Sequence, residues 1–144
     1  MDQINQHIRM LKQFYADFAN ADLDTMADIY CEAVDFADPI RWCVGLPELK
    51  RYFAETSENL SHCRFKFVTT VVQDASVVLE WDMEYSHPKL KKGEKLELPG
   101  LSMLVFSPER ERFTRHRDYY DLGAMLYEHI PLLGAGVRAL KRRL

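Results

Sequence analysis

The chain has 144 residues, of which 47% are hydrophobic and 28% are charged. This length and balance are typical of one folded globular domain, and they argue against a disordered chain, a collagen-like repeat and a disulfide-dense scaffold. With 19 basic and 22 acidic residues, the formal net charge is −3. The chain therefore lacks a domain-wide basic surface, and we expect no nucleic-acid partner.

Signatures of membranes, metals and cofactors are missing from the sequence. No apolar run reaches the roughly 20 residues that cross a bilayer, and residues 1–9 lack the pattern of a signal peptide, so we expect a cytoplasmic protein without membrane association. The three cysteines have no CxxC spacing, and the histidines have no ligand spacing such as HExxH. We therefore expect buried or half-buried free thiols, no metal and no cofactor.

Helical patterns come first along the chain. A helix over residues 3–20 is predicted by one apolar stripe at helical spacing, made of Ile4, Ile8, Leu11, Tyr15 and Phe18. Asp22 can cap a shorter helix over 23–30, and a short strand over 34–37 follows it. After an irregular loop, Pro47 suits the first turn of a third helix over 47–60.

Strand patterns dominate the second half. Runs of alternating residues predict strands over 64–71, 79–85, 96–106 and 113–120. The pair Pro99-Gly100 interrupts the third run and predicts a bulge or an edge position. Because helices precede strands instead of alternating with them, we expect an α+β fold with one antiparallel sheet curved around a helical layer.

A helical tail follows the last predicted strand. One apolar stripe consists of Leu122, Met125, Leu126 and His129 and stops at Pro131. The stretch after it ends in a basic cluster, which suits the C-terminal end of a helix dipole. We expect two parts, a domain over residues 1–120 and a C-terminal helical extension over 121–144.

Asp38 is the first candidate for chemistry. It lies between Ala37 and Pro39-Ile40, directly after a short predicted strand. A carboxylate in such an apolar setting has a raised pKa and can act as a general base or acid. An Asp before Pro also commonly accepts backbone N–H groups in a turn, and residue type alone favours that structural role.

Two further candidates are Tyr15 and the polar strand that contains His116. Tyr15 lies on the inward stripe of the first helix, so it is either a packed aromatic or a phenol that donates to a substrate oxygen. Alternation on the last strand puts His116, Asp118 and Tyr120 on one face. That face either lines a cavity or points outward and pairs with acidic residues of a neighbouring strand.

Several motifs in the first 55 residues resemble a known superfamily. They are Phe14-Tyr15-Ala16-Asp17-Phe18, the segment 23–30, the run 34–39 that ends in Asp38-Pro39, and Gly45 before a helix. Together they resemble the nuclear transport factor 2-like superfamily, and most closely its SnoaL-like and ketosteroid-isomerase-like branch. Over residues 4–120 the resemblance implies a cone-shaped fold with a deep apolar pocket, and homodimers that form through the outer sheet face.

The same resemblance implies site residues. In ketosteroid isomerases, Tyr15 would match the oxyanion donor and Asp38 the general base. The second acid of those enzymes would match Ser102, which carries no carboxyl group, so the chain departs from their pattern there. In SnoaL-like polyketide cyclases, Asp118 is the nearest match to the acid/base on the last strand. We expect a substrate pocket lined by Trp42, Phe53, Trp81 and Ser102.

Two functions follow as expectations. The first is binding of a hydrophobic small molecule, with cofactor-free isomerisation or cyclisation in which Asp38 takes a proton, Tyr15 donates to the oxyanion, and His116 or Asp118 assists. The alternative is a non-catalytic homodimeric interaction module. Epoxide hydrolysis ranks below both, because alternation puts Arg115 and Arg117 on the face opposite Asp118.

Overall fold

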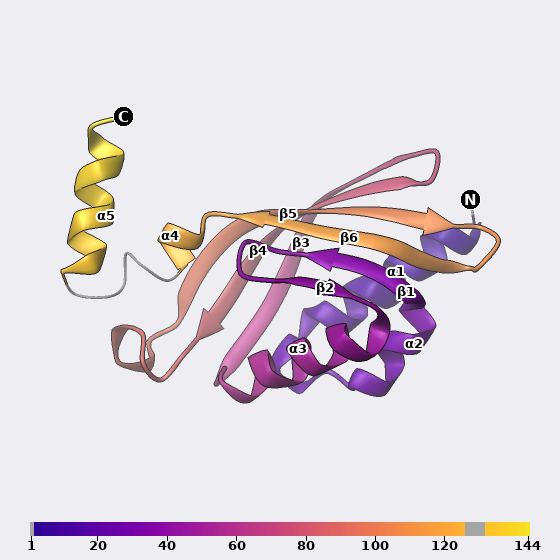
Figure 1. Ribbon diagram of the computed structural model, residues 1–144, viewed down its shortest axis with the longest axis horizontal. Coiled ribbons are helices and arrows are strands. Elements are labelled where there is room, and N and C mark those ends of the chain that lie inside the picture. The colour runs from indigo at the N-terminus through magenta and orange to yellow at the C-terminus, as the bar shows by residue number, and fades with distance from the viewer. Residues whose placement is uncertain (1, 126–131) are drawn as a thin grey trace.

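The computed structural model describes residues 2–125 and 132–144 and folds them into a curved sheet with helices packed against one face (Figure 1). The α+β class expected from the sequence is confirmed. The helices and short 3-10 turns that precede the long strands are α1 (Asp2–Ala16), η1 (Phe18–Asn20), η2 (Leu23–Thr25), α2 (Met26–Ile29) and α3 (Leu46–Glu58). The strands are β1 (Tyr30–Ala37), β2 (Trp42–Val44), β3 (His62–Gln73), β4 (Ser76–Ser86), β5 (Leu96–Ser107) and β6 (Arg112–Tyr120), with η3 (Lys91–Gly93) between β4 and β5.

The sheet is antiparallel except at one junction. Its strand order is β2-β1-β6-β5-β4-β3, and β1 runs parallel to β6. The expectation of a wholly antiparallel sheet is wrong at this pair, because the chain returns through β3, β4 and β5 before β6 reaches β1. The register pairs Phe36 with His116 and Ala37 with Arg117, so Asp38, directly after the end of β1, follows beside Asp118, which lies within β6.

The helical layer buries its apolar stripe against the inner face of the sheet. The stripe predicted for the first helix is confirmed, since Ile4, Ile8, Leu11 and Tyr15 are all buried. The helix ends earlier than residue 20, because Asp17 leaves helical geometry at φ −134° and a 3-10 turn carries Phe18. The strand that follows begins at Tyr30, which the sequence placed in a helix. Tyr30 pairs with Phe113 in the sheet and is 1% exposed.

The tail helices α4 (Leu122–Met125) and α5 (Leu133–Arg142) follow the sheet. The hydroxyl of Tyr85 donates to the carbonyl of Met125 at 2.6 Å and fixes α4 at the end of the sheet. Figure 1 shows α5 standing away from the body, and Lys141 pairs with Asp121 at 2.5 Å. The part of the predicted stripe at 126–131 lies outside the described residues. Across residues 2–125 and 132–144, no helix is long and apolar enough to span a membrane.

Gly100 lies inside the sheet and not at a bulge or an outer edge. It pairs with Trp81 on one side and Tyr120 on the other. Since Tyr120 is the last residue of β6, the preceding Pro99 pairs only with Asp82 of β4, which explains why proline is tolerated there. A Cβ atom on Gly100 would lie 2.2 Å from the indole ring of Trp81.

We predict that Gly100→Ala lowers the free energy of unfolding by about 1–3 kcal/mol, because the Trp81 ring must move in a packed interior. Gly136→Ala is the matched control, since a Cβ there meets nothing within 4 Å and alanine favours a helix. Equilibrium urea unfolding measures both variants. A Gly100→Ala protein as stable as the wild type would show that this contact does not constrain the strand.

Candidate active site

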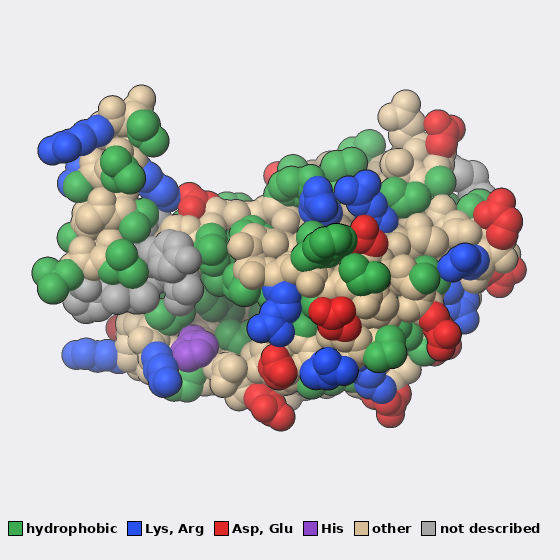
Figure 2. All heavy atoms as spheres, viewed as in Figure 1, with side chains coloured by type: hydrophobic (Ala, Val, Ile, Leu, Met, Phe, Trp, Pro, Cys, Tyr) green, Lys and Arg blue, Asp and Glu red, His purple; other side chains and the backbone are tan. Residues whose placement is uncertain are grey.

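A mostly apolar cavity of about 350 Å³ lies between the inner face of the sheet and the helices. Its size suits a small organic ligand. Figure 2 shows the molecule hollowed beside the tail, with hydrophobic side chains in the hollow. The wall is largely aromatic and includes Phe18, Phe36, Phe53, Phe65 and Trp81. Among the polar side chains that reach it are the carboxyl groups of Asp38 and Asp118 and the phenols of Tyr15, Tyr52 and Tyr120.

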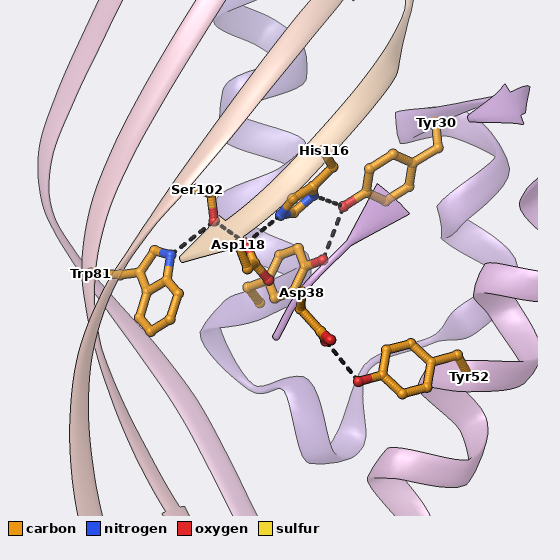
Figure 3. A network of polar contacts seen from close by, with 8 residues as sticks. Tyr30, Asp38, Tyr52, Trp81, Ser102, His116 and Asp118 are labelled. Atoms are coloured by element: carbon orange, nitrogen blue, oxygen red, sulfur yellow. Dashed lines mark hydrogen bonds and ion pairs between the residues drawn. The ribbon is translucent and has the colours of Figure 1, made fainter. Parts of the chain in front are cut away.

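Asp38 makes the turn contacts that the sequence suggested and also lines the cavity. Its Oδ1 accepts the backbone N–H groups of Ile40 at 2.8 Å and Arg41 at 2.9 Å, which forms the turn after β1. Its Oδ2 faces the helix α3 and accepts the hydroxyl of Tyr52 at 2.6 Å (Figure 3). The same side chain lines the cavity. The turn therefore holds the carboxylate through Oδ1, and Tyr52 of α3 holds it through Oδ2.

Burial raises the pKa of Asp38 above its ordinary value, against the hydrogen bonds from Tyr52 and the two backbone N–H groups, which lower it. The neighbouring charge of Asp118 adds to the rise. Because the pKa of Asp38 is higher in the folded protein than in the unfolded chain, the folded state loses stability as the pH rises from the unfolded-state pKa to the folded-state pKa. Burial and the bond to Asp38 also raise the pKa of Tyr52 well above its usual range, so Tyr52 remains a donor.

Asp118 is held by a different set of contacts. Its Oδ1 accepts the hydroxyl of Ser102 at 2.5 Å and lies 2.6 Å from Nε2 of His116. Ser102 in turn accepts the indole N–H of Trp81 at 2.9 Å (Figure 3). Within the described parts of the chain, Oδ2 of Asp118 has no hydrogen-bond partner. One oxygen therefore orients the carboxylate and the other remains available to a ligand.

His116 continues the contacts toward the first helix. Its side chain is fully buried, and its Nδ1 lies 2.7 Å from the hydroxyl of Tyr30. That hydroxyl lies 2.9 Å from the hydroxyl of Tyr15. The face of β6 that carries His116 and Asp118 therefore points inward, which settles the alternative that the strand pattern left open. A polar chain crosses the interior from β6 through β1 to α1.

The pocket residues expected from the sequence divide into two groups. Phe53 and Trp81 line the cavity, as expected. Ser102 is buried behind it and supports Asp118 instead of lining the wall. Trp42 is 65% exposed, and its indole N–H donates to Asp35 at 2.6 Å, so the structure places it on the surface. The side chain of Trp42 follows the β1–β2 hairpin, which turns it away from the cone.

Two polar residues of the site escaped sequence reasoning. The sequence pattern predicts a helix at Tyr30, whereas the strand β1 begins there. Tyr52 precedes Phe53, which the sequence pointed inward, and its contact with Asp38 depends on how α3 packs across the end of β1. No local pattern signals that contact.

Nucleophilic and metal chemistry find little support in the described residues. The cysteines Cys31, Cys43 and Cys63 are free and buried, as expected. Burial raises the pKa of the Cys63 thiol at the cavity wall to about 12, so it stays protonated and unreactive. Among residues 2–125 and 132–144, no group of three or more His, Cys, Asp or Glu side chains is arranged to hold a metal ion.

Comparison with known proteins gives one family match. Residues 11–116 match the model of the SnoaL-like domain. No curated protein matches the chain. The solved structures include a protein from Shewanella denitrificans OS-217 described as a SnoaL-like polyketide cyclase, with 20% identity, 81% of this chain and 92% of that chain covered, and a TM-score of 0.69.

Two other solved structures share the fold. An NTF2-like protein of unknown function from Burkholderia pseudomallei K96243 is 14% identical, with 88% of this chain and 96% of that chain covered and a TM-score of 0.75. TerC, co-crystallised with polyporic acid, is 18% identical, with 83% and 94% covered and a TM-score of 0.69. At these identities the likeness shows a common NTF2-like fold.

We predict that Tyr52→Phe raises the pKa of Asp38 further, because the variant loses a hydrogen bond that favours the ionised carboxylate. Titration of the carboxyl carbon of Asp38 by ¹³C NMR measures the change. Tyr119→Phe removes a hydroxyl from a half-exposed side chain of β6 (49% exposed) and serves as the control. An unchanged or lowered pKa in Tyr52→Phe would contradict the role of this hydrogen bond.

Proposed function

Since this chain belongs to the SnoaL-like domain family, we propose that it binds a largely apolar small molecule with a carbonyl or enol group and moves a proton on it, as an isomerase or a cyclase does. Proteins of this fold typically bind ligands or act as isomerases or cyclases. One observation carries the proposal. The carboxylates Asp38 and Asp118 and the phenol of Tyr15 face one apolar cavity, where water is scarce and polar interactions are strong.

The contacts favour Asp118 as the proton acceptor. A general base needs a lone pair that can reach the substrate. Within the described residues Oδ2 of Asp118 accepts no hydrogen bond, whereas Oδ2 of Asp38 already accepts one from Tyr52, which makes that carboxylate a weaker base. We therefore propose Asp118, and not Asp38 as expected from the sequence, as the leading base. Asp38 is then a second carboxyl group that binds the polar end of the ligand, and Tyr15 contacts the ligand oxygen.

The ligand class follows from the wall of the cavity. Aromatic rings on several sides suit a flat, cyclic, mostly apolar molecule, and the carboxyl groups of Asp38 and Asp118 face the cavity from the end of β1 and from β6. TerC, which shares the fold, was crystallised with polyporic acid, and that precedent supports a ring compound with oxygen substituents. The proton transfer described needs only the side chains of this chain.

Hydrogen–deuterium exchange of 2-tetralone tests the proposal. We predict that the protein accelerates exchange of the protons beside the carbonyl in D₂O, followed by ¹H NMR, because Asp118 removes them. Asp118→Asn should slow the catalysed exchange by about 10²–10⁴-fold, and Asp38→Asn should slow it less. Exchange in Asp118→Asn at the wild-type rate would overturn the assignment of Asp118.

Asp82→Asn is the matched control for these variants, since Asp82 is exposed on β4 and lies away from the cavity. Thermal unfolding of each variant verifies that the fold is retained. A larger loss in Asp38→Asn than in Asp118→Asn would return the role of base to Asp38. If the wild-type protein neither binds the ketone nor accelerates its exchange, the proposed function fails.

A second candidate function rests on the outer face of the sheet. Leu101, Met103 and Val105 are exposed at alternate positions of β5, and Tyr119 is paired with Leu101 on β6. An apolar stripe on an outer sheet face is typical of protein–protein contacts. We propose that two copies of the chain meet there, in a homodimer that either encloses the ligand sites or acts as a non-catalytic interaction module.

Light scattering with size-exclusion chromatography tests this interface. We predict a dimer mass at micromolar concentration, and Met103→Lys should shift it to the monomer, because a buried unpaired charge opposes association. Leu140→Lys on the exposed side of α5 (63% exposed) is the control and should leave the dimer intact. A monomeric wild-type protein would contradict the proposed interface.

A further inference from the structure

The polar chain behind the cavity has an arrangement that the proposed function does not use. Four side chains follow one another through the interior: Tyr15, Tyr30, His116 and Asp118. The two outer members, Tyr15 and Asp118, line the cavity, whereas the ring of His116 is fully buried. Both ends of a buried hydrogen-bonded chain therefore open into the same cavity.

The direction of the first hydrogen bonds is fixed by the chemistry of Trp81. An indole N–H can only donate, so Ser102 accepts from Trp81 and turns its own proton to Oδ1 of Asp118. The ionised carboxylate of Asp118 can only accept. The contact of 2.6 Å between Asp118 and Nε2 of His116 is then a donation from Nε2–H, and the tautomer of the ring is set.

With a neutral His116, the remaining protons have one consistent arrangement. Since Nε2 carries the proton, Nδ1 accepts the hydroxyl of Tyr30. Tyr30 has no second proton to give, so its oxygen accepts the hydroxyl of Tyr15. Tyr15 then presents only a lone pair to the cavity. It can accept a hydrogen bond from a ligand hydroxyl, but it cannot donate to a ligand carbonyl.

One added proton on His116 reverses the direction of the hydrogen bonds through Tyr30 and Tyr15. Nδ1–H now donates to Tyr30, and Tyr30 must turn its hydroxyl to Tyr15. Tyr15 then directs its own hydroxyl into the cavity, where it can donate to a carbonyl or an enolate oxygen. In this state the imidazolium and the carboxylate of Asp118 form an ion pair at 2.6 Å.

We propose that the proton on His116 determines whether Tyr15 accepts from a ligand hydroxyl or donates to a ligand carbonyl, so that Tyr15, Tyr30 and His116 form a proton relay for an enol–ketone pair. This deepens the proposed function, because it names the ligand oxygen chemistry that the cavity serves. Tyr15 is the catalytic residue of the relay, since it lines the cavity, and Tyr30 and His116 are positioning residues.

The relay step balances as three linked proton transfers. The ligand O–H bond breaks and its proton forms a bond to the Tyr15 oxygen, the Tyr15 proton moves to Tyr30, and the Tyr30 proton moves to Nδ1 of His116. The ligand becomes an enolate and His116 an imidazolium beside Asp118. The step starts with Asp118 protonated on Oδ2, so that Oδ1 still accepts from Ser102 and from Nε2–H of His116. Transfer of the Oδ2 proton to the enolate carbon gives the ketone and leaves the Asp118 carboxylate beside the imidazolium. In the reverse direction, Oδ2 of the carboxylate takes the proton beside the ketone carbonyl, and His116 returns its proton through Tyr30 and Tyr15 to the ligand oxygen.

The groups that face His116 come from three elements. They are Asp118 on its own strand, Tyr30 on β1, and Tyr15 on α1, whose ring lies 5.9 Å from the imidazole. The charge of Asp38, directly after β1, raises the pKa of Tyr15, and the charge of Asp118 raises the pKa of Asp38. On β5 the paired residue is the apolar Leu104. The only strong hydrogen-bonding partners of the imidazole in the described residues are therefore Asp118 and Tyr30.

Imidazole ¹⁵N NMR tests the relay without any ligand. At a pH where His116 is neutral, we expect a protonated Nε2 and an unprotonated, hydrogen-bonded Nδ1. Tyr30→Phe should shift the Nδ1 signal toward that of an unbonded nitrogen and leave Nε2 protonated. The control Tyr119→Phe should change neither signal. A neutral ring with its proton on Nδ1, or an Nδ1 signal that ignores Tyr30→Phe, would overturn the proposal.

A matched pair of probes, 2-naphthol and 2-naphthaldehyde, tests the effect on ligands. We expect the ratio of their dissociation constants in the wild type to shift toward the aldehyde by about fivefold or more as His116 becomes protonated, the effect of pairing or unpairing one buried polar group. In Tyr30→Phe, the hydroxyl of Tyr15 has lost its partner and turns to the cavity. The variant should favour the aldehyde at every pH.

A ratio that does not change with pH in the wild type, or that still changes in Tyr30→Phe, would contradict the relay. These outcomes are separate from those for the proposed function. A wild-type protein that does not accelerate ketone exchange but shows the expected probe ratios would contradict proton removal by Asp118 and support the control of Tyr15 by His116. If neither probe binds, the proposed ligand site fails, and the ¹⁵N signals alone support or overturn the relay.

Discussion

The parallel pairing of β1 with β6 is the constraint on which the site depends. The register of Phe36 with His116 brings Asp38, directly after β1, beside Asp118 of β6. The residues are 80 positions apart in the chain, so only this pairing joins them. Because side chains two apart in a strand share a face, the same register turns His116 and both carboxylates toward the helices.

The aromatic wall gives these polar groups their properties. Rings from α1, β1, α3 and β3 surround them. The ring of Tyr15, for example, contacts four others: Phe14, Phe18, Phe53 and Phe65. Burial in such a wall raises the pKa of Asp38 and keeps Tyr15 protonated. It also strengthens each hydrogen bond and makes an unpaired polar atom costly. Among the described residues, Oδ2 of Asp118 accepts no hydrogen bond, although Oδ1 of the same carboxylate belongs to the interior network.

Local sequence patterns predicted a large part of this arrangement. The apolar stripe with Tyr15 gave the first helix, and alternation gave the four long strands and the common face of His116 and Asp118. Asp38 was identified from its place between apolar residues and before proline. These predictions succeed because helix and strand periodicities act over neighbouring residues. The resemblance to the SnoaL-like branch agreed with the fold and with the family that residues 11–116 match.

What the sequence determined by itself was therefore the set of elements, the class of fold and the residue types available for acid–base chemistry. Tertiary structure alone decided that β1 runs parallel to β6 and that Tyr52 donates a hydrogen bond to Asp38. It also decided that Tyr30 connects Tyr15 to His116 and that the Trp42 side chain points away from the cavity. Each of these contacts joins side chains from different elements, and their positions depend on how the sheet curves and how the helices pack against it. Periodicity sets which face a side chain occupies, but it carries no information about the partner across the interior.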